Sequence, residues 1–147
     1  MSTASPAPLR GSCLCGAVRY EAERPVVWAH LCHCGRCRKT RGSAFSANAF
    51  VPLAAFRFVQ GEEQVRSYRP PGAERFRHAF CATCGATLPF RIEARGLVLL
   101  PMGGLDDDPG RPFDAQLWVA SKAPWWPLDA SLPQHVAELG SGTGRQS

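Results

Sequence analysis

The sequence predicts a mainly β domain of twisted antiparallel sheets with short helical insertions, and three observations lead to this prediction. Several segments alternate apolar and polar side chains with a period of two, which is typical of a strand with one buried face. The 13 prolines and 14 glycines among 147 residues interrupt the chain too often for long helices. The seven cysteines fall into three clusters, which favours a single domain stapled by zinc.

The apolar patterns place the predicted strands along the chain. Val18, Tyr20 and Ala22 alternate with polar residues, whereas the segment 96–102 is apolar throughout and indicates a strand buried on both faces. The predicted strands are residues 18–22, 75–80, 88–92, 96–102 and 117–119. Short helices are expected at residues 35–41 and 52–55, and turn signals such as Pro-Pro-Gly at 70–72 separate the strands.

The composition of the two ends predicts the limits of the domain. We expect a disordered lead at residues 1–10, a zinc-binding domain at 11–136 and a flexible Gly- and Ser-rich tail at 137–147. The small, polar N-terminus lacks the apolar segment of a signal peptide, and no run approaches the roughly 18 apolar residues of a membrane span. The prediction is therefore a cytoplasmic protein with no membrane partner, in a compartment where paired cysteines indicate metal or redox chemistry.

The charge pattern bears on the kind of partner. The formal net charge is +5, with fifteen arginines and only two lysines, but the basic residues are scattered and form no block of five or more. This scatter argues against a nucleic-acid partner and favours a solvated surface, with recognition of a small anionic ligand by a few arginines as the alternative. Seven thiolates and two zinc ions would together add −3 and lower the formal charge to about +2.

The cysteine clusters carry the strongest chemical signal. The spacings are Cys13-x-Cys15, Cys32-x-Cys34-x-x-Cys37 and Cys81-x-x-Cys84, and each cluster contains a Cys-Gly step. Zinc prefers thiolates in a tetrahedron, and C-x-x-C supplies two sulfurs from one turn. Glycine allows the sharp turn that directs backbone N–H groups at the sulfurs.

The numbers of cysteines favour a division into four and three. Cys13, Cys15, Cys81 and Cys84 can close one tetrahedral structural site, which would link segments 66 residues apart. Cys32, Cys34 and Cys37 supply three ligands, and an open fourth position is typical of catalytic zinc. His33 lies between two of these ligands, and strand geometry would turn its ring away from them.

Three other interpretations of the cysteines stay open. The chain could bind a single zinc ion and leave Cys32, Cys34 and Cys37 as free thiols. A redox dithiol at Cys81 and Cys84 lacks the expected βαβ context. Buried cysteines without metal would leave the repeated Cys-Gly step unexplained.

Five motifs occur in an order that resembles the glutathione-dependent formaldehyde-activating enzyme family, of the GFA or CENP-V type. The resemblance covers roughly residues 10–135 and implies a β structure with a structural zinc on the first four cysteines and a second zinc on the other three. The motifs are Gly11-Ser12-Cys13-x-Cys15-Gly16, Cys32-His33-Cys34-x-x-Cys37-Arg38-Lys39, Phe80-Cys81-x-x-Cys84-Gly85, Gly104-Leu105-Asp106-Asp107 and Ser121-Lys122-x-Pro124-Trp125.

One position departs from the pattern of this family. Many members carry His-Ile a few residues before the last motif, where this chain has Gln116-Leu117. If that histidine contributes to substrate binding, the substrate of this chain differs.

The resemblance implies a carbon–sulfur lyase-type enzyme similar to S-(hydroxymethyl)glutathione synthase, which joins formaldehyde or a related aldehyde to glutathione or another thiol. A zinc ion with three thiolate ligands is a weak Lewis acid, so we expect it to capture the thiol sulfur while proximity supplies most of the rate. Arg36, Arg38, Lys39 and Arg41 are candidates to hold the carboxylates of glutathione, with a solvated basic turn as the alternative.

Two rival functions remain at this stage. One is a non-catalytic zinc-binding module for a protein or a nucleic acid, and the other is a lyase that acts on a different thiol adduct. An enzyme requires a concave opening near Cys32, Cys34 and Cys37, whereas a binding module could present a flat basic face.

Overall fold

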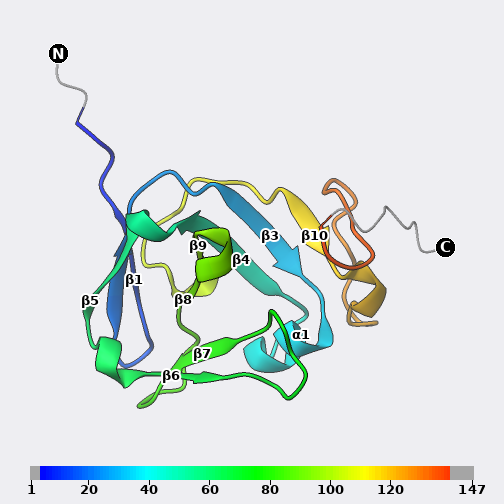
Figure 1. The fold of residues 1–147 in the computed structure, drawn as a ribbon. Coiled ribbons are helices and arrows are strands. Elements are labelled where there is room, and N and C mark those ends of the chain that lie inside the picture. The colour runs from blue at the N-terminus through cyan, green and yellow to red at the C-terminus, as the bar shows by residue number, and fades with distance from the viewer. Residues whose placement is uncertain (1–3, 140–147) are drawn as a thin grey trace.

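The computed structural model describes residues 4–139 and places five of the ten strands of this part of the chain in one sheet (Figure 1). This sheet has the order β10 (Ala115–Leu117), β3 (Trp28–Cys32), β4 (Ser46–Pro52), β9 (Leu97–Pro101) and β8 (Phe90–Ile92). All of its pairs are antiparallel except β10 with β3, so the sheet is mixed. The predicted tail at 137–147 lies outside the described residues from position 140 onward.

Two smaller sheets complete the domain. A three-stranded antiparallel sheet has the order β1 (Leu9–Ser12), β2 (Arg19–Ala22) and β5 (Phe56–Gln60). A hairpin pairs β6 (Val65–Tyr68) with β7 (His78–Cys81). The α-helix α1 (Gly35–Arg41) connects β3 with β4 and lies near the hairpin (Figure 1). Short 3-10 turns lie at Leu53–Ala55, Glu62–Gln64, Glu93–Arg95, Met102–Gly104 and Val119–Ser121.

The hydrophobic core joins the three-stranded sheet to the five-stranded sheet. Leu9 and Tyr20 from the first meet Val51, Val98 and Leu100 from the second, and all five are almost completely buried. Burial of a large apolar side chain contributes about 1.5–3 kcal/mol. Cys13 and Cys81 belong to the same core cluster, so the first cysteine group lies at the edge of the core.

The structure confirms the mainly β fold with short helical insertions. Strands β2, β7, β8 and β9 fall at the predicted segments, with β7 extending one residue further to Cys81, and α1 matches the predicted helix at 35–41. The predicted helix at 52–55 is a single 3-10 turn. No helix among residues 4–139 has the length and apolar character needed to cross a membrane.

Two boundaries differ from the sequence expectation. The last strand is Ala115–Leu117 rather than 117–119, because Trp118 adopts a left-handed conformation with φ 57° and the chain continues into a 3-10 turn. Strand β1 begins at Leu9, two residues before the predicted start of the domain at residue 11. Leu9 is fully buried, and Arg10 contacts Asp107 through both its backbone N–H and its guanidinium group.

Candidate functional site

The first cysteine group joins two loops that are distant in sequence. Cys13 and Cys15 come from the loop after β1, Cys81 ends β7, and Cys84 lies in the following turn. Their four Sγ atoms all lie within 4.8 Å of one another, with Cys13–Cys15 at 3.5 Å and Cys15–Cys81 at 4.0 Å. Tetrahedral zinc with Zn–S bonds of about 2.3 Å places its sulfurs about 3.8 Å apart. The four thiols therefore fit a metal ion of this kind.

Backbone amides support the same cysteine group. The N–H of Val18 donates to Cys13 Sγ at 3.3 Å. Gly16 and Gly85 adopt left-handed conformations with φ 77° and 74°, which suit glycine, and thereby form the tight turns next to the cysteines. Backbone hydrogen bonding from Ala86, followed by that from Cys15, lowers the pKa of Cys84 to about 6. The pKa of Cys13 is also lowered, whereas that of Cys15 is raised to about 11. The loops thus favour the thiolate, the form that binds metal, at Cys13 and Cys84.

The second cysteine group lies where β3 ends and α1 begins. Cys32 ends the strand, Cys34 is the N-cap residue of the helix and Cys37 lies in its first turn. The three Sγ atoms lie within 4.8 Å of one another, and the N–H of Cys37 donates to Cys34 Sγ at 3.3 Å. Hydrogen bonds from the thiols of Cys32 and Cys37 lower the pKa of Cys34, whereas the pKa values of Cys32 and Cys37 are raised. Within this group the thiolate is therefore favoured at Cys34.

His33 takes a structural position rather than a place in the second cysteine group. Its ring is fully buried, with Nε2 3.3 Å from Gln116 Oε1, and it packs edge-on against Phe45. Gln116 is also fully buried, and its amide group donates to the carbonyl of Asp129 at 2.8 Å. Because the amide nitrogen is committed to Asp129, the Gln116 oxygen accepts from His33 Nε2. Gln116, the residue that departs from the family pattern, therefore links the His33 ring to the Asp129 backbone in the interior of the protein.

The four predicted substrate-binding cations separate into different environments. Arg36 and Lys39 are exposed on α1, and the Arg36 guanidinium lies 5.9 Å from the centre of the Phe76 ring. Arg38 is partly buried. Arg41 turns inward, where its Nε donates to Ser46 Oγ at 3.0 Å and its Nη2 donates to Asn48 Oδ1 at 3.3 Å. The structure therefore brings only Arg41 of these four into the pocket described next.

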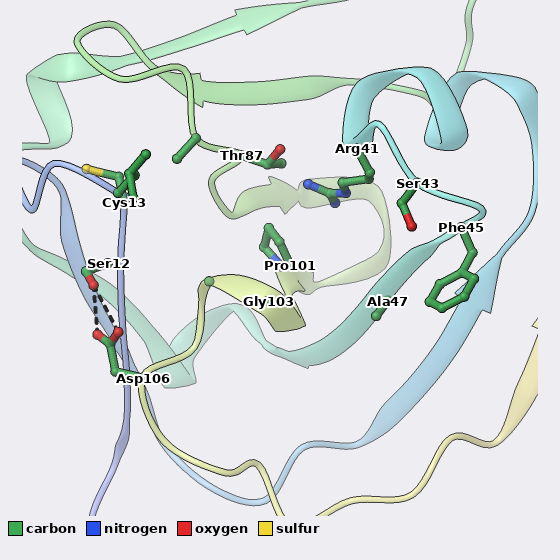
Figure 2. A pocket seen from close by; sticks show the side chains of 13 residues that line it. Ser12, Cys13, Arg41, Ser43, Phe45, Ala47, Thr87, Pro101, Gly103 and Asp106 are labelled. Carbon is green, nitrogen blue, oxygen red and sulfur yellow. Dashed lines mark hydrogen bonds between the residues drawn. The ribbon is translucent and has the colours of Figure 1, made fainter.

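A pocket of about 620 Å³ lies between the loop after β1, which carries Cys13, and the end of α1, which carries Arg41 (Figure 2). This volume falls in the range of about 300–1,000 Å³ that is usual for small-molecule sites. Its wall includes Cys13 of the first group and Arg41, which adjoins the second group, but not Cys32, Cys34 or Cys37. The lining residues are Ser12, Cys13, Leu14, Arg41, Ser43, Phe45, Ala47, Ala86, Thr87, Pro101, Gly103, Gly104 and Asp106.

A comparison with known protein families shows to which family this chain belongs. The profile of the family described as "Glutathione-dependent formaldehyde-activating enzyme", abbreviated GFA, matches residues 8–121. The chain belongs to the GFA family. This match confirms the resemblance inferred from the ordered motifs, while the number of zinc ions and the roles of single residues stay predictions.

One curated protein and one solved structure are similar to this chain. A protein of Halomonas elongata, named provisionally as a glutathione-dependent formaldehyde-activating enzyme, is 31% identical over 132 residues, which are 83% of this chain and 82% of that protein. A crystal structure of a Rhodobacter sphaeroides protein superimposes with a TM-score of 0.53 at 30% identity. The superimposed region covers 67% of this chain and 89% of the Rhodobacter sphaeroides chain. In both comparisons the similarity extends over most of the other protein's chain.

Sequence reasoning missed most of the residues that line the pocket. Ser12 and Asp106 occur in two of the ordered motifs, but nothing in the sequence indicates that they meet. In the structure the Ser12 hydroxyl donates to both carboxylate oxygens of Asp106, at 2.8 and 3.1 Å. The signal that could have identified them is their presence in the GFA motifs outside the cysteine clusters.

Proposed function

We propose that this chain catalyses the addition of the glutathione thiol to formaldehyde or a related aldehyde. The observation that carries the proposal is the second cysteine group, in which three sulfurs converge and no other side chain of the described residues completes the ligand set. GFA membership and the name of the Halomonas elongata relative support the choice of substrates. The paired cysteines also favour a reducing, cytoplasmic location.

Zinc is the metal that this donor set fits best, because clustered thiolates select it over harder cations. We propose that Cys13, Cys15, Cys81 and Cys84 hold a structural ion and that Cys32, Cys34 and Cys37 hold a second one. A zinc ion at the second group would keep one coordination position open and would stabilise a thiolate there.

The reaction itself is a simple addition, so the protein's main task is to position the reactants. The thiol sulfur forms a bond with the aldehyde carbon, the carbonyl electron pair moves to oxygen, and that oxygen takes up the proton lost by the thiol. No other product is released. Holding the two reactants together removes much of the entropic barrier. Of the four cations predicted to contact the carboxylates of glutathione, Arg41 is the one that lines the pocket, and we propose it as the main contact. The same role for Arg36, Arg38 and Lys39 stays a prediction from the sequence.

The rival function, a zinc-binding module for a protein or a nucleic acid, receives less support. A concave pocket lies beside Arg41, which adjoins the second cysteine group, although Cys32, Cys34 and Cys37 do not themselves line it. Five arginines are paired with acidic residues, which reduces the free positive charge on the surface. These pairs are Arg10–Asp107, Arg57–Glu21, Arg75–Glu138, Arg91–Glu62 and Arg111–Asp114. A lyase that acts on another thiol adduct would use the same site.

Exchange NMR with glutathione and formaldehyde tests the proposed reaction. We expect the purified protein to contain two zinc ions and to accelerate exchange between the free thiol and its hydroxymethyl adduct. The variant Cys34→Ser should lose one zinc ion and reduce the acceleration by roughly 100-fold or more, because an essential ligand is lost.

The protein-free reaction and the variant Ser67→Ala, an exposed position in β6, serve as controls. An unaccelerated reaction with fully metallated wild-type protein would contradict the proposed function for this pair of substrates. Undiminished acceleration in Cys34→Ser would contradict the role of the second cysteine group.

A further inference from the structure

The pocket carries opposite charges at its two ends. Figure 2 shows the Arg41 guanidinium directed into the pocket at one end and the Asp106 carboxylate at the other, with Pro101 and Gly103 between them. A small ligand with a single charge would use only one of these ends. The arrangement therefore suits an elongated ligand that carries a negative group and a positive group far apart.

Arg41 has unused capacity to bind an anion. Its Nη1 atom is buried and has no hydrogen-bond partner, and none of the ion pairs among residues 4–139 includes it. The bonds from Nε to Ser46 and from Nη2 to Asn48 fix the plane of the guanidinium group. A buried guanidinium without a carboxylate partner is costly unless a ligand supplies the negative charge.

Asp106 offers the complementary charge in a fixed orientation. Both of its oxygens accept from the Ser12 hydroxyl, and no cation of the described part of the chain forms an ion pair with it. The next residue, Asp107, is instead occupied by Arg10 at 2.9 Å. Of the two neighbouring carboxylates, only Asp106 lines the pocket and remains available to a ligand's cation.

The wall between these ends permits close approach of a peptide backbone. Gly103 and Gly104 line it without side chains. A Cβ atom at Gly103 would meet nothing within 4 Å, whereas one at Gly104 would lie 2.7 Å from the oxygen of the buried Tyr20, so packing against the core requires glycine there. The two glycines leave this part of the wall bare, which allows the backbone of an extended ligand to lie close to it.

We propose that this pocket binds an extended, zwitterionic peptide thiol, with a terminal carboxylate at Arg41 and a terminal ammonium group at Asp106. This inference rests on the proposed function and specifies how its thiol substrate is selected. In glutathione the glycine carboxylate and the γ-glutamyl ammonium group lie at opposite ends, with the cysteine residue between them and a second carboxylate beside the ammonium group. Binding of the glycine carboxylate at Arg41 places the cysteine one residue away from the Arg41 end of the pocket, where Arg41 donates to Ser46, the partner of Cys32 across β3 and β4.

An alternative role for Arg41 makes a different prediction. The guanidinium also lies close enough to Cys37 and Cys32 to be influenced by their charge, so it could serve only to balance a metal-bound thiolate cluster. In that case the loss of Arg41 would weaken all ligands equally. A carboxylate-binding role requires that the loss affect only ligands with a free glycine carboxylate.

The ammonium end can be tested with S-methylglutathione, which has no free thiol. Titration calorimetry on the metal-loaded protein compares this ligand with its N-acetyl derivative. We expect N-acetylation to weaken binding to the wild-type protein about tenfold, as is typical for loss of a charged hydrogen bond. The variant Asp106→Asn should bind both ligands with the same, weaker affinity, whereas the matched control Asp107→Asn should still discriminate between them.

The carboxylate end is tested with the glycine ethyl ester of S-methylglutathione. The wild-type protein should bind the ester about tenfold more weakly than the free acid, and Arg41→Gln should remove this difference. Because Arg41 is partly buried, Arg41→Lys provides a second variant that retains the charge and should retain part of the discrimination. In the wild-type protein, the amide signals of Gly103 and Gly104 should shift on binding.

The outcomes separate this inference from the proposed function. Three results would each overturn the pocket assignment, even if exchange with formaldehyde is accelerated. The wild-type protein could bind all derivatives equally, or both Arg41 variants could bind acid and ester with equally weakened affinity. The third such result is that Asp106→Asn still discriminates between S-methylglutathione and its N-acetyl derivative. Charge-selective binding without accelerated exchange would support the pocket assignment and contradict the proposed reaction.

Discussion

At the scale of single residues, the packing around Tyr20 shows where glycine is required. Tyr20 is only 1% exposed, and its ring lies against the backbone of Gly11 on the neighbouring strand. A Cβ atom at Gly11 would lie 2.2 Å from the tyrosine ring, far inside van der Waals contact. The glycine of the first family motif thus has a packing reason that is independent of the adjacent cysteines.

We predict that Gly11→Ala destabilises the protein by about 1–3 kcal/mol, the usual cost of overpacking a core. Gly103→Ala is the control, because its Cβ atom would meet nothing within 4 Å and its expected effect is within about 0.5 kcal/mol. Urea unfolding followed by tryptophan fluorescence measures both. Similar midpoints for the two variants would contradict this packing argument.

The buried bridge at Gln116 gives a second prediction at this scale. Gln116→Ala should destabilise the protein by about 1–3 kcal/mol, because the Asp129 carbonyl and His33 Nε2 both lose their partner. Gln60→Ala is a matched control, since the Gln60 amide also donates to backbone carbonyls but is exposed. Chemical unfolding of both variants checks this difference, and equal losses would argue against a structural role for the buried amide.

At the scale of elements, the first cysteine group fastens the β6–β7 hairpin to the three-stranded sheet. Cys13 and Cys15 follow β1, and Cys81 and Cys84 end the hairpin, so a metal ion would join two units whose backbones pair in different sheets. The second group instead joins β3 to the start of α1 within six residues of chain. The two groups should therefore contribute unequally to stability.

We predict that Cys81→Ser lowers the midpoint of thermal unfolding much more than Cys34→Ser. Loss of the first metal ion releases a long-range link worth several kcal/mol, whereas the second group links only residues that are already close in the chain. Thermal unfolding with parallel zinc determination tests this ranking. Equal midpoints, with one zinc ion lost in each variant, would contradict the assignment of a structural role to the first group.

At the scale of the whole molecule, the first strand extends the domain beyond its expected limit. Leu9 is fully buried in the core, and Arg10 ties β1 to Asp107 near the pocket. The carbonyl of Ala7 also accepts a hydrogen bond from Arg24 at 3.1 Å. The chain from residue 7 onward therefore contributes to the domain.

Truncation provides the corresponding prediction. Removal of residues 1–6 should leave the unfolding midpoint nearly unchanged, whereas removal of residues 1–10 should cost at least the 2–5 kcal/mol expected for emptying the Leu9 site. Differential scanning calorimetry of the two truncated proteins measures the contrast. An unchanged midpoint after removal of residues 1–10 would show that β1 is dispensable.

Local sequence patterns were sufficient to predict four of the strands and both cysteine groups of this protein. The alternation of side chains predicted β2, β7 and β8, and a continuous apolar run predicted β9. The cysteine spacings with their Cys-Gly steps identified both cysteine groups, because such patterns involve only a few neighbouring residues. The strands β3 and β4 were not predicted. They lie in the centre of the sheet, where burial on both faces removes the alternation, as in the stretch from Ala47 to Val51.

By itself the sequence determined the two cysteine groups and the fold class, whereas only the tertiary structure decided the pocket. Asp106 meets Ser12 across 94 residues of chain, and Gln116 meets His33 across 83. The direction of Arg41, inward to Ser46 and Asn48 rather than outward from a basic turn, depends on how α1 packs on β4. Such contacts arise from the packing of distant segments, which no local pattern encodes, and they give this small domain a cavity with opposite charges at its two ends.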